Sequence, residues 1–384
     1  LLNPISVISA DFNADGKMDY AVANYGNNNV TLFFGATSGK LVGDPNFKTD
    51  SSPLGIASGD FNADGFADML TPNYTNNTVS LFLGNGSGSF SLSGNFSVGL
   101  NPFTATLADF NGDSKLDVAV TNSTGNDVSV LLGNGAGSLG AAANFSVGNF
   151  PTGIVAGDFN ADGKQDLVVA NYSDNNFSFL AGNGLGSFAA AVNFACGSGP
   201  NAITKGDFNN DSKLDVATAN YNVGNVSVLL GNGLGSFAAA TNFTAGGLPY
   251  DVAAADFDLD GNADLAVVNN GSNNVSILMG NGTGAFASAV NYAVGNAPFS
   301  ISLADYDLDG YADLAVANSA SNNVSILTGN QNGTFATAVN YLTGIGASGV
   351  VNALINGDTK IDLAVANYTS DEFTVLTNSS VPTT

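Results

Sequence analysis

A nine-residue acidic loop occurs eight times in this chain, always 49 residues after the previous copy. The first copy reads Asp11-Phe-Asn13-Ala-Asp15-Gly-Lys-Met-Asp19. Oxygen-bearing side chains occupy loop positions 1, 3, 5 and 9, and carboxylate and amide oxygens at such short spacing are the ligands that a hard cation such as Ca²⁺ prefers. The loop therefore predicts a calcium site.

The copies begin at positions 11, 60, 109, 158, 207, 256, 305 and 354, without insertion or deletion. In the eighth, Leu354 replaces the first acid, so Asn356, Asp358 and Asp362 are expected to form only a weak site. Seven complete copies predict about seven bound Ca²⁺ ions. The expected side-chain ligands are Asp11, Asn13, Asp15 and Asp19; Asp60, Asn62, Asp64 and Asp68; Asp109, Asn111, Asp113 and Asp117; Asp158, Asn160, Asp162 and Asp166; Asp207, Asn209, Asp211 and Asp215; Asp256, Asp258, Asp260 and Asp264; and Asp305, Asp307, Asp309 and Asp313.

The residue types that are missing narrow the function further. The chain has no His, Arg or Trp, a single Glu, Glu372, and a single Cys, Cys196. Without His it lacks the usual general base and zinc ligand, and without Arg it lacks bidentate recognition of phosphate. We therefore expect no enzymatic activity, and we expect Cys196 to serve as a small buried hydrophobic residue.

The net charge of −24 comes mainly from the loops, which hold most of the 32 acidic residues. This charge repels nucleic acid and disfavours anionic membrane surfaces, and no apolar stretch is long enough to be inserted across a bilayer. Without a cation, the clustered carboxylates repel one another and destabilise the fold. Calcium is thus expected to staple each loop, which favours an extracellular or cell-surface location, where free Ca²⁺ is plentiful.

The residues between the loops predict strands, because short apolar runs alternate with Gly- and Asn-rich turns and none has helical spacing. In the sixth repeat we expect strands over 249–255, 265–269, 275–279 and 285–294, with the acidic loop between the first two. Eight such units predict an all-β fold, an eight-bladed β-propeller of four-stranded antiparallel blades in a single domain over 1–384. Small residues before each loop favour placing the first strand nearest to the axis.

Only seven outer strands can be assigned, so the last blade is expected to lack its outer strand. An exposed strand edge invites pairing with another chain. Self-association into a homo-oligomer or fibre is therefore one expectation for the partner.

The loop is followed by Leu-Ala-Val-Ala-Asn and then by Val-Ser-Val-Leu-Leu-Gly-Asn-Gly, or close variants. This pattern resembles the FG-GAP or VCBS-type repeats of integrin α-subunit propellers and of many bacterial secreted proteins, over essentially the whole chain. The resemblance implies calcium loops on one face, ligands that use the opposite face, and one further metal contact from the main-chain carbonyl at loop position 7. The residues at that position are Lys17, Phe66, Lys115, Lys164, Lys213, Asn262 and Tyr311.

Two departures from the pattern concern loop position 6. Ser114 and Ser212 stand where the other complete copies have Gly. A left-handed turn at these positions would cost free energy, because only Gly adopts that conformation without steric strain.

Aromatic residues recur at two repeat positions that are expected at the rim opposite the loops. Aromatic side chains with a polar tip suit contacts with sugars or proteins, and the alternative is that they pack between blades. The first set, at the end of the second strand, is Tyr25, Tyr74, Tyr172, Tyr221 and Tyr368; the second, at the start of the first strand, is Phe103, Tyr250 and Phe299.

Five Asn-x-Ser/Thr acceptor sequences share the position just before the third strand. They are candidate glycosylation sites, although Asn at this position also suits the turn. Their asparagines are Asn29, Asn176, Asn225, Asn274 and Asn323.

Together these features predict a non-enzymatic, extracellular, calcium-binding propeller that acts as an adhesion or structural module. The alternative is a lectin-like propeller that binds an extracellular glycan or protein through its aromatic face.

Overall fold

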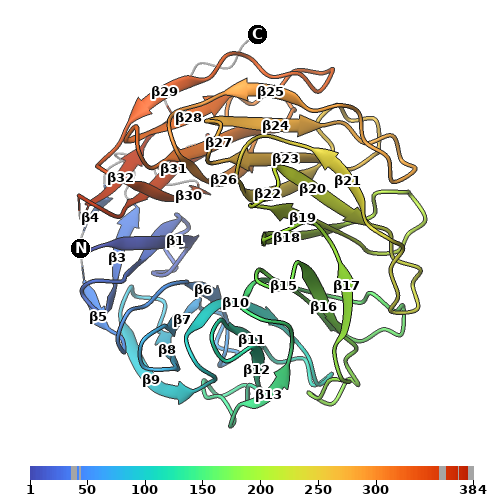
Figure 1. Cartoon of the computed structure of the whole chain (residues 1–384). Helices are drawn as coiled ribbons and strands as arrows, with labels where there is room; N and C mark the ends of the chain where they lie inside the picture. Colours follow the sequence, from blue (N-terminus) through green and yellow to red (C-terminus); the bar gives the residue numbers. More distant parts are fainter. Residues whose placement is uncertain (36–40, 43–44, 354–359, 371, 379–384) are drawn as a thin grey trace.

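Every named strand belongs to one of eight antiparallel sheets that stand in a ring around a central axis (Figure 1). The computed structural model describes residues 1–35, 41–42, 45–353, 360–370 and 372–378. The all-β fold and the eight-bladed propeller predicted from the repeats are both confirmed. None of the described residues forms a helix with the length and apolarity that a membrane crossing requires.

The innermost strand of each blade, called strand A, ends at the residue before the acidic loop. Small residues such as Ala108 and Gly157 occupy this end. The A strands are β1 (Pro4–Ala10), β6 (Ala57–Gly59), β10 (Pro102–Ala108), β14 (Pro151–Gly157), β18 (Pro200–Gly206), β22 (Pro249–Ala255), β26 (Pro298–Ala304) and β30 (Ala347–Ala353).

The second strand of each blade, strand B, is buried along its whole length. Its side chains face a neighbouring blade on both sides of the sheet, which explains why it reads as a continuous apolar run rather than an alternating one. The B strands are β2 (Asp19–Asn24), β7 (Asp68–Asn73), β11 (Asp117–Asn122), β15 (Asp166–Asn171), β19 (Asp215–Asn220), β23 (Asp264–Asn269), β27 (Asp313–Asn318) and β31 (Asp362–Asn367).

Strand C follows after a short turn and is buried over most of its length in most blades. A hydrogen-bonded row of polar side chains joins it to strand B: Asn269 donates from Nδ2 to Ser276 Oγ at 2.8 Å. The C strands are β3 (Asn29–Gly35), β8 (Thr78–Gly84), β12 (Asp127–Leu131), β16 (Asn176–Leu180), β20 (Asn225–Leu229), β24 (Asn274–Leu278), β28 (Asn323–Leu327) and β32 (Glu372–Leu376).

The outermost strand, strand D, is shorter than the sequence predicts. In the sixth blade the expected strand over 285–294 is a strand only from Val290 to Ala293. Phe286 forms an isolated bridge with Gly280 and buries its side chain, so the first half of the segment serves the core. The D strands are β4 (Leu41–Val42) and β5 (Asn46–Lys48) in the first blade, then β9 (Phe90–Ser97), β13 (Ala143–Ser146), β17 (Val192–Ala195), β21 (Thr241–Thr244), β25 (Val290–Ala293) and β29 (Val339–Leu342).

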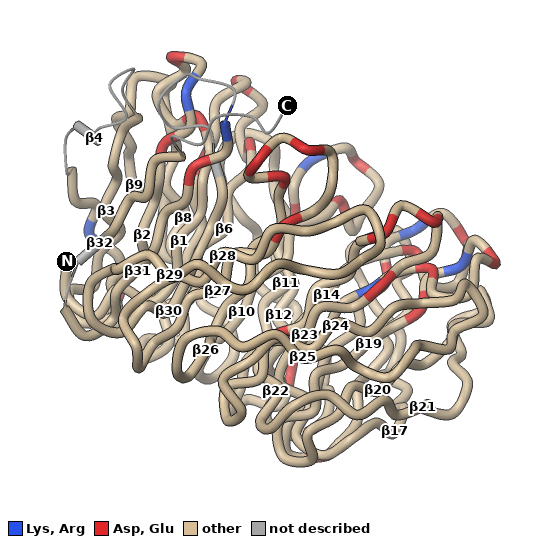
Figure 2. Tube along the Cα trace, turned by 90° about the horizontal axis from the view of Figure 1, so that it is seen from above, with Lys and Arg blue, Asp and Glu red and all other residues tan. Residues whose placement is uncertain are grey.

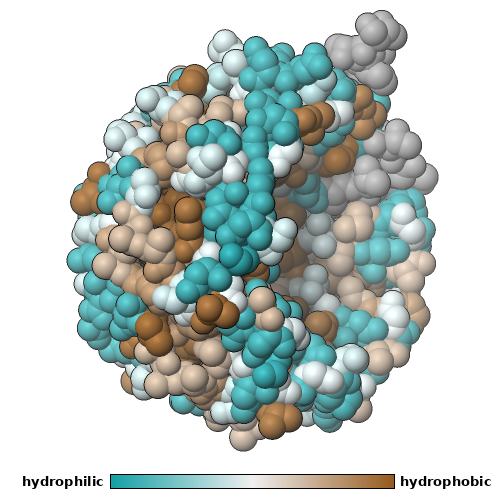
Figure 3. Space-filling view, turned by 90° about the vertical axis from the view of Figure 1, so that its right-hand side faces the viewer, coloured by the Kyte–Doolittle hydropathy of each residue, from teal (hydrophilic) through white to brown (hydrophobic). Residues whose placement is uncertain are grey.

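The hydrophobic core is divided among the interfaces between blades. Each core cluster combines residues of two neighbouring blades: one joins Val226 and Val228 of the fifth blade to Leu265 and Val267 of the sixth. At the surface, hydrophobic side chains form separate patches among hydrophilic ones on the side shown in Figure 3. Stability therefore depends on the ring being closed, since each blade buries its faces only against its neighbours.

The ring closes by direct packing of the eighth blade on the first. Val7 and Val22 share a buried cluster with Ala364 and Ala366. Ser348 Oγ donates a hydrogen bond to the Pro4 carbonyl at 3.1 Å, which ties β30 to β1. Within the described part of the chain the eighth blade has three strands, β30, β31 and β32, as expected from the sequence.

Candidate metal centres

The acidic loops connect strand A to strand B in each blade, and most of the charged residues lie along one face of the ring (Figure 2). In the first loop, Asp11 accepts hydrogen bonds from the backbone N–H of Asp15 at 3.1 Å and of Gly16 at 2.8 Å. Asn13 Oδ1 accepts a second contact from the Asp15 N–H at 3.0 Å. These bonds fold the loop back on itself, so that the side chains at positions 1, 3 and 5 come together.

Backbone conformation contributes to the same loop shape. Positions 4 and 6 both have left-handed backbones, with φ of 54° at Ala14 and 81° at Gly16. Ser114 and Ser212, which replace Gly at position 6, have φ of 62°. Both serines thus adopt the conformation that the sequence analysis identified as costly for a residue with a side chain.

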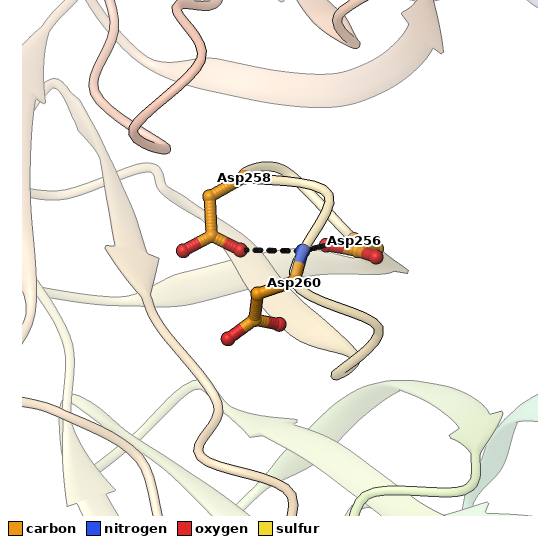
Figure 4. A group of neighbouring side chains, drawn as sticks. All are labelled: Asp256, Asp258 and Asp260. Carbon is orange, nitrogen blue, oxygen red and sulfur yellow. Dashed lines mark hydrogen bonds between the residues drawn. The ribbon is translucent and has the colours of Figure 1, made fainter.

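The acidic side chains converge most closely in the sixth and seventh loops. One carboxylate oxygen from each of Asp256, Asp258 and Asp260 lies within 4.8 Å of the others, and the Asp260 N–H donates to both Asp256 and Asp258 (Figure 4). A second group within the same limit comprises Asp305, Asp307 and Asp313.

The first five loops carry Asn at position 3, so each has one carboxylate fewer there but keeps an amide oxygen. A carboxylate oxygen that accepts one N–H retains a lone pair for a cation. The donor set of all seven complete loops therefore suits Ca²⁺ chemically.

The acid at position 9 has a structural role that the sequence analysis missed. Asp215 is the first residue of β19 and is fully buried. Its Oδ2 accepts the Phe208 N–H at 2.8 Å, and its Oδ1 accepts the Gly231 N–H at 2.7 Å. It therefore fastens the start of the loop and the end of strand C to strand B. The available clue in the sequence was that an Asp recurs directly before the apolar run of each strand B.

Burial makes these position-9 carboxyls weak acids. Burial raises the pKa of Asp19 to about 6, against the hydrogen bonds from the Gly35 and Phe12 N–H groups, which lower it. The negative charges of the other loop acids raise it further. The same causes raise the pKa to about 6 for Asp68, Asp166, Asp215 and Asp264, and to about 7 for Asp313.

Lysine at position 7 forms a contact that was not predicted. Lys115 Nζ lies 3.0 Å from Asp113 Oδ2, and the hydrogen bond and charge of Lys115 hold the pKa of Asp113 below its usual range. The same pair joins Lys17 to Asp15, Lys164 to Asp162 and Lys213 to Asp211. These pairs are partly exposed and contribute little to stability, but they partly offset the charge at position 5.

The eighth loop is described only at its end. Asn356 and Asp358 lie outside the described residues. Asp362 begins β31, is fully buried, and accepts the Asn378 N–H at 2.6 Å, so it serves the same structural purpose as the other position-9 acids.

The predicted aromatic positions lie at the opposite face of the blades. Phe103, Tyr250 and Phe299 line an axial cavity of 430 Å³ between the starts of the A strands. The Tyr250 and Phe299 rings are 4.1 Å apart, and Tyr221 continues the row with centroids 6.2 Å from Tyr250. Tyr172 contacts both Tyr221 and Phe150.

The structure thus joins part of the two aromatic sets into one arc from the fourth to the seventh blade. Tyr25, Tyr74 and Tyr368 have the equivalent place after strand B in the first, second and eighth blades. Within the described part of the chain these three tyrosines stack on no other ring, so they are not part of this arc.

Family models match most of the chain. The FG-GAP-like repeat model matches residues 11–71, 73–120, 109–169, 158–218, 207–267 and 256–316, and the FG-GAP repeat model matches residues 297–339. The chain belongs to the FG-GAP repeat family. A search of curated proteins finds no significant match.

Solved structures similar to this FG-GAP propeller share its fold at low sequence identity. A putative 6-phosphogluconolactonase from Bacteroides fragilis NCTC 9343 is 17% identical with a TM-score of 0.62, over 88% of this chain and 98% of that chain. An Agrocybe aegerita lectin, described for specific recognition of non-reducing terminal N-acetylglucosamine, is 18% identical with a TM-score of 0.56, over 96% and 100%. A functionally unknown protein from Desulfotomaculum acetoxidans DSM 771 is 11% identical with a TM-score of 0.60, over 90% and 98%.

The candidate glycosylation sites of the FG-GAP repeats take part in the polar row that links the strands. Asn176 Oδ1 accepts Asn171 Nδ2 at 2.7 Å, and Asn225 and Asn274 have equivalent bonds at 2.8 Å. Asn323 makes the same contact and is only 9% exposed. Asn29 also donates from Nδ2 to Asn46 at 3.3 Å. These asparagines thus link strands B and C across the turn, and their glycosylation stays a prediction.

The lone thiol packs as expected of a small hydrophobic residue. Cys196 is partly buried against the cluster formed by Phe177 and Ile203. Burial raises the pKa of its thiol to about 11, so the thiol stays protonated at neutral pH.

Proposed function

We propose that this FG-GAP propeller is a non-enzymatic, calcium-binding module that works outside the cell in adhesion or as a structural unit. The observation that supports this most strongly is the convergence of acidic side chains in successive loops on one face. A ring of unneutralised carboxylate clusters carries a free-energy cost, which bound divalent cations remove. We propose about seven Ca²⁺ ions, one for each complete loop.

The proposal that the protein is not an enzyme follows from its residue types. It has no His and no Arg, and most of its acids belong to the loops. An extracellular or cell-surface location accords with sites of modest affinity, because the calcium affinity of extracellular modules is on the order of 10⁻⁴ to 10⁻³ M. The proposed partners are further copies of the chain, in an oligomer or fibre, or an extracellular protein or glycan.

Metal analysis combined with thermal unfolding tests the proposal. Protein dialysed against calcium should retain about seven ions per chain, and EDTA should lower its melting temperature by more than about ten degrees, because each ion stabilises only the folded loop. Magnesium serves as the control cation, since it demands stricter octahedral geometry. An unchanged melting curve in EDTA, or far fewer than six ions, would rule out the stapling role.

A second candidate function is lectin-like binding at the aromatic face. It is favoured by the axial cavity, which is lined by Phe103 and by the Tyr250 and Phe299 rings, whose centroids are 4.1 Å apart. Aromatic faces of this kind bind the apolar side of sugar rings. A glycan array in calcium tests the idea: binding that Tyr250→Ala abolishes while the melting temperature is kept would support it, and the absence of any glycan signal would count against it.

A further inference from the structure

The axial cavity has one acidic residue in its wall. Residues 49 positions apart, one from each blade, form a ring around this cavity. In seven blades the residue is uncharged and no larger than Thr; the seven are Ser6, Gly55, Thr104, Gly153, Ala202, Ser300 and Gly349. In the sixth blade it is Asp251 of β22. Because seven blades close without an acid at this place, the fold alone does not account for the carboxylate.

A bulge in β22 brings two neighbouring side chains to the same cavity. In a regular strand successive side chains point to opposite faces, so Tyr250 and Asp251 would be separated. The register of β22 against β23 shifts between Pro249 and Asp251, and both Tyr250 and Asp251 line the cavity. A corresponding shift in β26 accompanies Phe299 in the same wall. The acid is thus combined with the Tyr250 and Phe299 rings, whose centroids are 4.1 Å apart.

The Asp251 carboxylate keeps the capacity to accept further hydrogen bonds. Its Oδ1 accepts the Val252 N–H at 2.9 Å, and its Oδ2 accepts the Ile301 N–H of β26 at 3.3 Å. Each oxygen therefore retains a lone pair for another donor. These two bonds lower the pKa of the carboxyl, but burial raises it more. None of the described residues that line the cavity is a Lys, so the wall holds a carboxylate without a cation beside it, which costs free energy.

We propose that the axial cavity binds a small ligand through a protonated amino group, which contacts the Asp251 carboxylate and faces the Tyr250 and Phe299 rings. An ammonium group has several N–H donors for the carboxylate oxygens, and a hydrogen bond between two charged groups is stronger than a neutral one. The faces of aromatic rings attract the same cation. The cavity volume of 430 Å³ lies within the range of roughly 300–1,000 Å³ that is typical of small-molecule sites.

Two kinds of ligand carry this group. An amino sugar with a free amine adds a ring whose apolar side packs on the aromatic faces, and a simple organic ammonium ion has the charge alone. The net charge of −24 draws either one toward the protein. The inference rests on the lectin-like candidate function, because it concerns the same cavity, and it names the chemical class of sugar that the cavity selects.

Calorimetry of the calcium-loaded chain with three probes tests the inference. Glucosamine should bind at least about tenfold more tightly than N-acetylglucosamine, whose amide carries no charge. Ethanolamine separates the two sources: binding as tight as that of glucosamine supports recognition of the ammonium group alone, and weaker binding supports an amino sugar. Equal affinity for the two sugars would overturn the inference and leave the lectin-like function intact. If no probe binds, the inference fails, and the glycan array still decides on the lectin-like function.

Variants of the protein locate the contact. Asp251→Asn removes the charge with little change in shape and should weaken glucosamine binding by at least about tenfold. Asp174→Asn is the matched control, because Asp174 is exposed on the fourth blade and does not line the cavity, so the same change in net charge should leave binding unchanged. Phe299→Leu keeps the wall apolar but removes a ring face and should weaken binding about threefold or more.

Melting temperatures show that each variant is folded at the temperature of the titration. The comparison of the three probes uses the unaltered chain, so it does not depend on the folding of any variant. Glucosamine binding to Asp251→Asn with the affinity of the parent would overturn the inference. An equal loss of affinity in Asp174→Asn would also overturn it, because the net charge of the chain would then explain the effect without a contact at Asp251.

Discussion

At the scale of single residues, the loop acids divide into two groups with different tasks. Acids at positions 1 and 5 are partly exposed and gather around the space a cation would take, as Asp256 and Asp260 do. Acids at position 9 are buried and hold backbone N–H groups of two other segments. In the seventh loop Asp313 also belongs to the carboxylate group that it forms with Asp305 and Asp307. The division predicts that the two kinds of acid differ in how far their contribution depends on calcium.

Asp215→Ala should lower the free energy of unfolding by about 2–4 kcal/mol even without calcium, because it leaves the N–H groups of Phe208 and Gly231 buried without acceptors. Asp211→Ala, at the exposed position 5 of the same loop, should cost little in calcium-free protein and show its effect only when calcium is present. Urea unfolding of both variants in EDTA and in calcium measures the difference. Equal stability of Asp215→Ala and the parent in EDTA would contradict the structural role.

The two serines at position 6 give a second test at this scale. Ser114→Gly should stabilise the protein by about 0.5 kcal/mol, because relief of the left-handed strain exceeds the added backbone entropy of the unfolded chain. Ser173, an exposed turn residue whose φ is not positive, is the control: Ser173→Gly should destabilise slightly. Thermal unfolding of both variants compares them directly, and a loss of stability in Ser114→Gly would show that the serine side chain makes a compensating contact.

At the scale of elements, large apolar side chains of the C–D turns pack against the neighbouring blade. Phe237 of the fifth blade, for example, contacts the Phe159 and Phe194 rings of the fourth. Phe237→Ala should cost about 3–5 kcal/mol, because it empties a site among four aromatic rings. Leu234 belongs to the same turn and is 80% exposed, so Leu234→Ala should change stability by less than about 0.5 kcal/mol. Denaturant unfolding of the two variants measures the loss in the free energy of unfolding. Similar losses for both would mean that the backbone of the turn, and not the Phe237 side chain, holds the blades together.

The sequence predicted the strands better than it predicted these contacts between blades. The period of 49 residues and the turn residues gave the number and order of strands, since hairpins depend on local patterns. Phe286 was predicted to be part of strand D, because an apolar residue within a strand-like run has no local sign that its side chain packs against a neighbouring blade. Position 9 was read as a ligand only, because an acid can serve a metal or a backbone N–H with the same oxygens.

The contacts among the aromatic rings could not be predicted from the sequence either. The repeat positions placed Tyr250 and Phe299 at one rim, but which rings meet depends on the spacing of blades. Register shifts between Pro249 and Asp251 and between Pro298 and Ser300 fall at these two aromatic residues. Bulges of this kind re-aim side chains, and no local sequence signal announces them.

At the scale of the whole molecule, the loops and the buried acids make stability depend on pH in opposite ways with and without calcium. In calcium-free protein, burial raises the pKa of five position-9 acids from an ordinary 3.8 to about 6 and that of Asp313 to about 7; the five are Asp19, Asp68, Asp166, Asp215 and Asp264. The folded state then binds more protons than the unfolded state between these values. Its stability is therefore greatest near pH 4 and falls as pH rises to about 7.

Calcium should reverse this slope, because the ion binds the deprotonated loops and is released when they take up protons. The melting temperature of calcium-stripped protein should thus rise on acidification from about pH 7 to pH 5, whereas that of calcium-saturated protein should fall over the same range. The range stays above the region where the low-pKa acids such as Asp113 protonate. Replacing Asp313 by Asn should flatten the calcium-free slope near pH 7 first, since its carboxyl has the highest of these pKa values. Parallel slopes with and without calcium would mean that the ions do not bind at these loops, and the stapling of the ring would then need another explanation.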